Sequence, residues 1–190
     1  MHYLVANIND FTDAQIDLAL KQMPQKQREY IENKKQLRSK KQSIVARILL
    51  KNLLLKFFEI SDGSNIEFDE NGKPNYSNST DIHISLTHSG DFAAAAVSNK
   101  PVGIDIQVYK QVSEKLLNRV CTKDELEFVN STGNKGFFKI WTAKEAYSKC
   151  SCINLTKVFK LSFVKNDTLC GLDKKLYSYS DNSYELAIIE

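Results

Sequence analysis

Residues 137–149 read FFKIWTAKEAYSK, and residues 102–109 read VGIDIQVY. In the first stretch Glu145 and Lys149 are four residues apart, so both side chains lie on one side of a helix. The second stretch is apolar and strand-like, and it carries Asp105. We expect the helix and the strand to bring two carboxylates together with lysine side chains. Such a set is suited to holding a divalent cation against a phosphate-bearing substrate.

Each of these residues also has an ordinary structural explanation. On a strand Asp105 shares its face with Gln107, and an acid that is shielded there needs a cation or hydrogen-bond donors, so a salt-bridged strand acid is one interpretation. Glu145 and Lys149 alone would be an ion pair along a helix, and Trp141 alone would be a core residue. Only the combination of the two stretches indicates chemistry.

The remaining pattern predicts an α+β fold with mostly antiparallel strands, because helices and strands do not alternate as they do in a parallel sheet. We expect a pseudo-two-fold pair of similar lobes, each a small mostly antiparallel sheet packed on a long helix. The lobes are expected at residues 1–100 and 101–190, with the break near residues 99–101. The expected strands are 3–7, 66–68, 82–87, 92–98, 102–108, 158–164, 176–179 and 184–189, and the expected helices are 13–23, 29–58, a short one from 122, and 136–150 after a loop at 131–136.

The composition is that of a soluble globular protein. The chain has 190 residues, of which 42% are hydrophobic and 26% are charged, which allows one sizeable core or two small lobes. It has no run of 18 apolar residues, so we expect no membrane span, and its first residues do not have the pattern of a signal peptide. Its four cysteines do not form a disulfide framework, and we expect reduced thiols in a cytoplasmic protein.

The positive charge is concentrated in one segment. Residues 26–56 contain two acids and ten basic residues: Lys26, Arg28, Lys34, Lys35, Arg38, Lys40, Lys41, Arg47, Lys51 and Lys56. Most of these side chains have the character of a solvated helix face, but an excess this large also indicates a polyanionic partner. His88, at a predicted strand end before a glycine, is either a structural histidine or an anion contact.

Taken together, five stretches resemble motifs of the 4′-phosphopantetheinyl transferases of the larger, surfactin-synthetase-activating type. In chain order they are residues 43–51 (SIVARILLK), 71–74 (NGKP), 86–89 (LTHS), 102–107 (VGIDIQ) and 141–149 (WTAKEAYSK). The last has the Lys-Glu-Ala form of the family's final motif. The resemblance spans about residues 26–150, and the last two motifs with their spacing are the most specific part of it.

The resemblance implies a reaction and its partners. Members of the family move the phosphopantetheine arm of coenzyme A onto a serine of an acyl or peptidyl carrier protein and release 3′,5′-ADP. It implies Mg²⁺, with Mn²⁺ as the alternative ion, and carriers of fatty-acid, polyketide or nonribosomal-peptide synthesis. It further implies a monomer that binds coenzyme A between its two lobes, without a nucleic acid or membrane partner.

The resemblance also implies roles for individual residues. Asp105, Gln107 and Glu145 would be the metal ligands, with Glu145 or a water that it holds as the base for the serine proton and Lys149 stabilising charge on the phosphate. Coenzyme A would be contacted by Lys26 and His88 at its 3′-phosphate and by Lys73 and Pro74 along its adenine side. Further contacts would come from Lys144 and from one of three basic residues, Arg38, Lys41 and Arg47. Of these three, Arg47 is the one included in the predicted cofactor-binding set.

Two departures from the family pattern leave alternatives open. Gln107 stands where the family usually has a third acid, so one negative charge is lost and metal affinity is expected to be weaker. Gln42 stands where relatives are expected to have an arginine. The alternatives are therefore a catalytically impaired member of the family, motivated by Gln107, and a nucleic-acid-binding protein, motivated by the basic segment.

Overall fold

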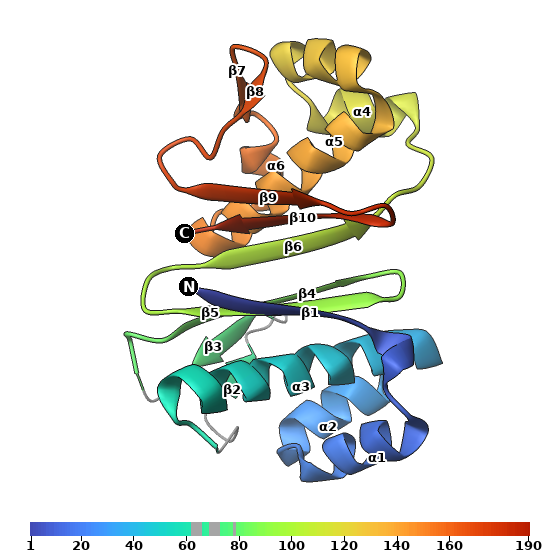
Figure 1. Cartoon of the computed structure of the whole chain (residues 1–190), viewed down its shortest axis with the longest axis vertical. Coiled ribbons are helices and arrows are strands. Elements are labelled where there is room, and N and C mark those ends of the chain that lie inside the picture. The colour runs from blue at the N-terminus through green and yellow to red at the C-terminus, as the bar shows by residue number, and fades with distance from the viewer. Residues whose placement is uncertain (62–65, 69–72, 78) are drawn as a thin grey trace. The chain divides into compact units, whose positions relative to one another are not determined.

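The computed structural model describes residues 1–61, 66–68, 73–77 and 79–190. The chain divides into two compact units, an N-terminal unit of Met1–Pro101 and a C-terminal unit of Val102–Glu190. Figure 1 shows the elements of both units. Asn71 and Gly72 of the NGKP stretch lie outside the described residues.

The N-terminal unit is built on the three-stranded antiparallel sheet β1-β5-β4. Its elements are β1 (His2–Asn7), the 3₁₀ helix η1 (Ile8–Asp10), α1 (Asp13–Gln22), α2 (Gln25–Glu32), α3 (Leu37–Phe58), β2 (Ile66–Phe68), β3 (Pro74–Tyr76), β4 (His83–Ser89) and β5 (Phe92–Ser98). The long helix α3 lies along this sheet (Figure 1), and its Leu50 and Leu53 share a buried core with Ala95 and Val97 of β5. The alanines of β5 allow this close approach because they are small.

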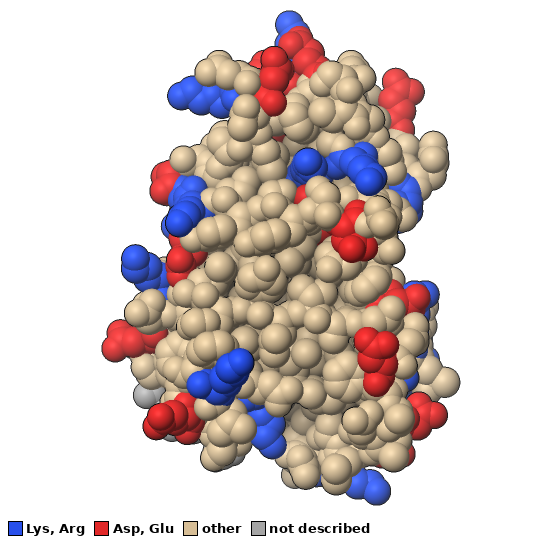
Figure 2. All heavy atoms as spheres, in the orientation of Figure 1, with Lys and Arg blue, Asp and Glu red and all other residues tan. Residues whose placement is uncertain are grey.

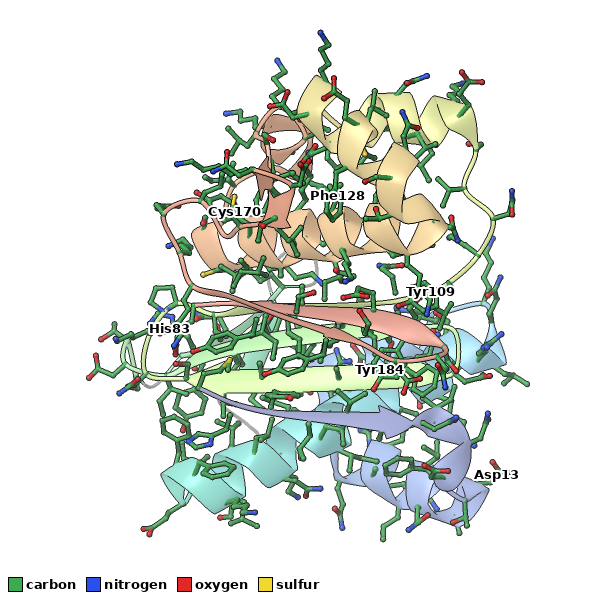
Figure 3. All side chains as sticks on the ribbon, turned by 45° about the horizontal axis from the view of Figure 1, so that its top comes forward. Asp13, His83, Tyr109, Phe128, Cys170 and Tyr184 are labelled. Atoms are coloured by element: carbon green, nitrogen blue, oxygen red, sulfur yellow. The ribbon has the colours of Figure 1, made fainter. Side chains whose placement is uncertain are left out.

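The C-terminal unit repeats the same plan with the sheet β6-β10-β9. Its elements are β6 (Gly103–Val108), α4 (Glu114–Val120), α5 (Lys123–Ser151), α6 (Leu155–Val158), β7 (Val164–Lys165), β8 (Thr168–Leu169), β9 (Leu176–Ser180) and β10 (Tyr184–Ile189). In each three-stranded sheet the unit's first strand pairs with its last, and the last pairs with the strand before it. Tyr109 and Tyr184, labelled in Figure 3, lie at the end of the sheet where β6 stops and β10 starts.

The α+β class with small antiparallel sheets is confirmed, and three elements differ from the prediction. The helix expected over residues 29–58 is two helices, α2 and α3, because the chain leaves the helical path in the polar stretch after Asn33. Where a loop was expected at 131–136, α5 has a kink at Gly133, whose φ is +70°. The strand expected at 158–164 is wrong, because Asn154 caps a short helix that ends at Val158 and only Val164 joins a strand.

The surface carries both signs of charge. On the face drawn in Figure 2, atoms of Lys and Arg lie interspersed with those of Asp and Glu. Arg38 of the basic segment forms an ion pair with Asp91. Across the described ranges, no helix combines the length and the apolar character that a membrane crossing requires.

Candidate functional site

Strand β6 and helix α5 touch backbone to backbone at Gly103. A Cβ atom placed on Gly103 would lie 1.9 Å from the carbonyl oxygen of Ala146 and 2.7 Å from the backbone nitrogen of Cys150. Only a residue without a side chain therefore permits this approach. The contact sets the height of α5 over β6 and thereby the distance from Asp105 to the side chains of Glu145 and Lys149.

We predict that Gly103→Ala lowers the free energy of unfolding by about 1–3 kcal/mol, because the new methyl group forces a well-packed helix away from the strand. Urea unfolding followed by circular dichroism measures the change. Asn130→Ala is the control, since it places alanine at an exposed position of α5, where alanine favours the helix. Equal stability of the two variants would contradict the packing argument.

Asp105 forms the centre of the site. Its side chain is only 3% exposed, and its Oδ1 accepts a hydrogen bond from Nζ of Lys149 at 2.7 Å. The same ammonium group donates to the carbonyl oxygen of Ile104 at 3.0 Å, and Nε2 of Gln107 donates to Oδ2 of Asp105 at 3.1 Å. The structure thus brings together three of the residues that the sequence placed at one site.

Glu145 is the second carboxylate of the site. It is half-buried one turn before Lys149 on α5. The pKa of Glu145 is raised from its ordinary value to about 7, first by burial and then by the negative charge of Asp105, while the positive charge of Lys149 opposes both effects. A carboxyl group with a pKa near 7 is suited to accept a proton at neutral pH.

The donor set fits a divalent cation that keeps some of its own water. Asp105 and Glu145 offer two carboxylates close enough to repel each other, and Gln107 offers an amide in place of a third acid. Among the described residues no three side chains of His, Cys, Asp or Glu are grouped as a complete metal site. Mg²⁺ is commonly held by one or two carboxylates with waters and substrate phosphate, so two carboxylates are sufficient.

The raised pKa of Glu145 predicts how stability depends on pH in the metal-free protein. From its ordinary value of 4.5 to about 7, the folded protein holds a proton that the unfolded chain has released. The free energy of unfolding contributed by Glu145 therefore falls as pH rises through this window. Urea unfolding of the wild type and of Glu145→Gln in a chelator, at about pH 4.5 and pH 7.5, isolates the effect. If the difference in the free energy of unfolding between the two proteins is the same at both pH values, the raised pKa of Glu145 is refuted.

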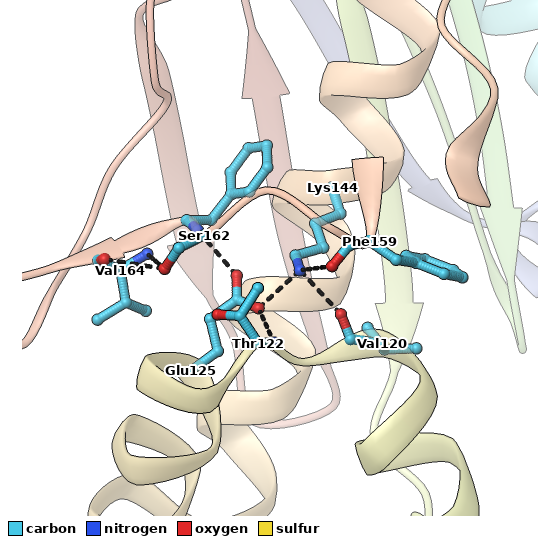
Figure 4. A network of polar contacts seen from close by, with 8 residues as sticks. Val120, Thr122, Glu125, Lys144, Phe159, Ser162 and Val164 are labelled. Carbon is cyan, nitrogen blue, oxygen red and sulfur yellow. Dashed lines mark hydrogen bonds and ion pairs between the residues drawn. The ribbon is translucent and has the colours of Figure 1, made fainter. Parts of the chain in front are cut away.

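Lys144 does not belong to this group, and the expectation that it contacts coenzyme A is corrected by its burial. Its side chain has no exposed surface, and Nζ donates to Glu125 Oε2 at 2.6 Å and to the carbonyl oxygens of Val120 at 2.8 Å and Phe159 at 3.1 Å (Figure 4). A group with three acceptors and no exposed surface is not available to a dissolved ligand.

Glu125 is the residue that sequence reasoning missed in this network. The stretch from Thr122 to Glu125 has the sequence of a capping box. The structure contains this box, with Thr122 N donating to Glu125 Oε2 at 2.7 Å. The same carboxylate also accepts a hydrogen bond from Phe163 N at 2.8 Å, and it is fully buried. Trp141 packs against Phe159 with ring centroids 5.9 Å apart, as a core residue does.

The other predicted cofactor contacts lie in the N-terminal unit. Lys26 is exposed on α2, Lys73 is half-buried just before β3, Pro74 is buried at the start of β3, and His88 is exposed on β4. These four residues remain predictions.

The turn that follows His88 is held by the start of α3. Nε2 of Gln42 donates to the carbonyl oxygen of Gly90 at 2.7 Å, and Nε of Arg38 donates to the same oxygen at 3.2 Å. Arg47 is five residues beyond Gln42, about 140° around the helix, and its guanidinium lies over the ring of Phe68. Of the three basic residues left open by the sequence, Arg38 is therefore the one beside this turn.

Comparison with known proteins finds similarity over the C-terminal unit. Residues 101–185 match the family model described as the 4′-phosphopantetheinyl transferase superfamily. The 4′-phosphopantetheinyl transferase gsp of Aneurinibacillus migulanus is 32% identical over 113 residues, which cover 56% of this chain and 46% of that protein.

Two further relatives agree with this match. The 4′-phosphopantetheinyl transferase psf-1 of Bacillus pumilus is 29% identical over 57% of this chain and 49% of that protein. The 4′-phosphopantetheinyl transferase Sfp of Bacillus subtilis is 26% identical over 56% of this chain and 50% of that protein. The chain thus spans about half the length of the curated relatives that it matches.

Proposed function

We propose that this chain is a member of the 4′-phosphopantetheinyl transferase superfamily, whose model its residues 101–185 match, and that it transfers phosphopantetheine from coenzyme A to a serine of a carrier protein. The observation that carries this proposal is the group formed by Asp105, Glu145 and Lys149 inside the matched residues. The serine oxygen forms a bond to the β-phosphorus of coenzyme A, the bond to the bridging oxygen breaks, and 3′,5′-ADP leaves with the electron pair.

Each side chain of the group has its own role in this transfer. Asp105 and Glu145 would hold Mg²⁺, and Gln107 would contribute its amide oxygen or a bound water. When bound, the ion supplies Lewis-acid polarisation of the phosphate oxygens. Glu145, or a water that it holds, accepts the serine proton, for which its raised pKa suits it. Lys149, fixed by Asp105 and the carbonyl oxygen of Ile104, places an ammonium group against the phosphate charge.

Residues of the N-terminal unit bind the remainder of coenzyme A. We assign the 3′-phosphate to Lys26 and His88 and the adenine side to Lys73 and Pro74. Arg38 takes the place of Arg47 in this set, because Arg38 holds the turn that follows His88 and is itself exposed. The basic segment attracts a carrier protein that is acidic around its serine.

The donor half of the reaction supplies the test. Coenzyme A, Mg²⁺, the protein and an apo carrier are incubated, and the release of 3′,5′-ADP is followed by anion-exchange chromatography. Carriers of fatty-acid, polyketide and nonribosomal-peptide synthesis are compared, each with a serine-to-alanine version as its control. We expect release only with an intact serine and without chelator. Binding of coenzyme A without release on any carrier would instead identify an impaired member of the family.

A further inference from the structure

A cavity lies within the N-terminal unit. Its volume is about 360 Å³, and it is formed by α1, α2, α3 and the start of β2. Apolar walls are provided by Leu18, Met23, Pro24 and Ile48, and the basic side chains on it are Arg47 and Lys51. Leu18 is 58% exposed, which leaves a large apolar side chain at the surface beside the cavity.

Arg47 is an unusual wall residue because its charge is buried without a counter-charge from the residues that the structure describes. Only 8% of the residue is exposed, Nη1 donates to the carbonyl oxygen of Ser43 at 2.9 Å, and the guanidinium carbon lies 4.1 Å from the centre of the Phe68 ring. Nε has no hydrogen-bond partner among the described residues, and none of their carboxylates forms an ion pair with Arg47. Burial lowers the pKa of Arg47 to about 10.

A buried cation of this kind is costly unless an anion pairs with it. A carbonyl oxygen and an aromatic ring stabilise the guanidinium only in part. Lys51, one turn further along α3, adds a second positive charge at the exposed side of the cavity. The cavity therefore offers positive charge at α3 and apolar walls from α1 and the turn after it, with neutral polar side chains between them from Gln15, Gln22, Gln27 and Asn52.

We propose that this cavity binds a fatty-acid anion, whose carboxylate pairs with Arg47 and whose hydrocarbon chain lies against Leu18, Met23 and Ile48. A carboxylate matches the planar fork of a guanidinium. A single hydrophilic end on an apolar chain matches the distribution of charge in the cavity better than a nucleotide or an inorganic phosphate, which would place several charges against apolar walls.

Calorimetric titration of the full chain with decanoate tests the proposal, with 1-decanol as the uncharged control and inorganic phosphate as the control without a chain. We expect decanoate to bind at least tenfold more tightly than either. In a methyl-labelled protein, decanoate shifts the signals of Leu18, Met23 and Ile48. Equal binding of decanol, preferential binding of phosphate, or shifts confined to other methyl groups would overturn the proposal.

Two variants test separately how much the charge of Arg47 and the space in the cavity contribute to decanoate binding. Arg47→Met keeps an apolar side chain of similar length and is expected to weaken decanoate binding at least tenfold while leaving the free protein as stable as the wild type or more so. Ala19→Trp keeps Arg47 and fills the cavity, so it is also expected to abolish binding. Lys21→Gln, exposed on the same helix outside the cavity, is the control. Wild-type affinity in a folded Arg47→Met or Ala19→Trp protein would refute the site.

Discussion

Asp105→Asn is expected to lower the rate of phosphopantetheine transfer by about 10²–10⁴-fold, the range found when a catalytic carboxylate or a stabilising charge is removed. The asparagine keeps the shape of the side chain and one of its two acceptor oxygens, and its amide nitrogen can donate to the oxygen of Gln107 once that side-chain amide rotates. It removes the negative charge that fixes Nζ of Lys149 at 2.7 Å and that is needed to hold a cation beside Glu145. The initial rate of 3′,5′-ADP release measures the loss.

The control for this prediction comes from helix α5, which carries Glu145 and Lys149. Glu127→Gln removes an equal charge from an exposed position of α5 and is expected to leave the rate unchanged. Glu145→Gln is expected to lose activity as Asp105→Asn does, since the second carboxylate and the base are removed together. A wild-type rate for Asp105→Asn would remove Asp105 from the catalytic group and with it the assignment of the metal ligands.

Lys144→Met is expected to lower the free energy of unfolding by about 3–5 kcal/mol, the usual cost of breaking a buried ion pair by removing one partner. Neither Lys144 nor Glu125 has any exposed surface, so the substitution leaves the carboxylate of Glu125 without its cation in the core. The backbone N–H groups of Thr122 and Phe163 still donate to that carboxylate but carry no full charge. Urea unfolding of the wild type and of Lys144→Met at pH 7 gives the difference in their free energies of unfolding.

A double variant distinguishes lost charge from lost packing. Glu125→Gln combined with Lys144→Met removes both charges, and the glutamine carbonyl can still accept from one backbone N–H. We expect this protein to regain most of the stability that Lys144→Met loses. If the double variant is as unstable as the single one, the cost comes from packing and the ion pair is not the cause.

The proximity of Asp105, Glu145 and Lys149 could be predicted because each of the two stretches that carry them obeys short-range rules. Residues four apart on a helix share a side, and Asp105 lies in a strand motif recognisable by its own sequence. The sequence therefore predicted which carboxylates and which lysine meet. The hydrogen bond that Gln107 donates to Asp105 could not be predicted, because an amide donates as readily as it accepts.

The role of Lys144 was predicted wrongly for a physical reason. Its partner Glu125 is 19 residues earlier in the chain, and the capping box already explained that acid. Nothing local indicates that a capping residue will also neutralise a lysine. The choice of Arg38 over Arg47 likewise needed the structure, because it depends on which side of α3 faces the turn at Gly90.

The intact mass of an apo carrier protein after incubation with the chain, coenzyme A and Mg²⁺ tests the central claim most directly. The account predicts that the carrier gains the mass of one phosphopantetheine group with the wild-type protein, and that the gain disappears with chelator and with Asp105→Asn. A carrier that stays unmodified in the presence of a folded protein that binds coenzyme A, or one modified equally well by Asp105→Asn, would contradict it.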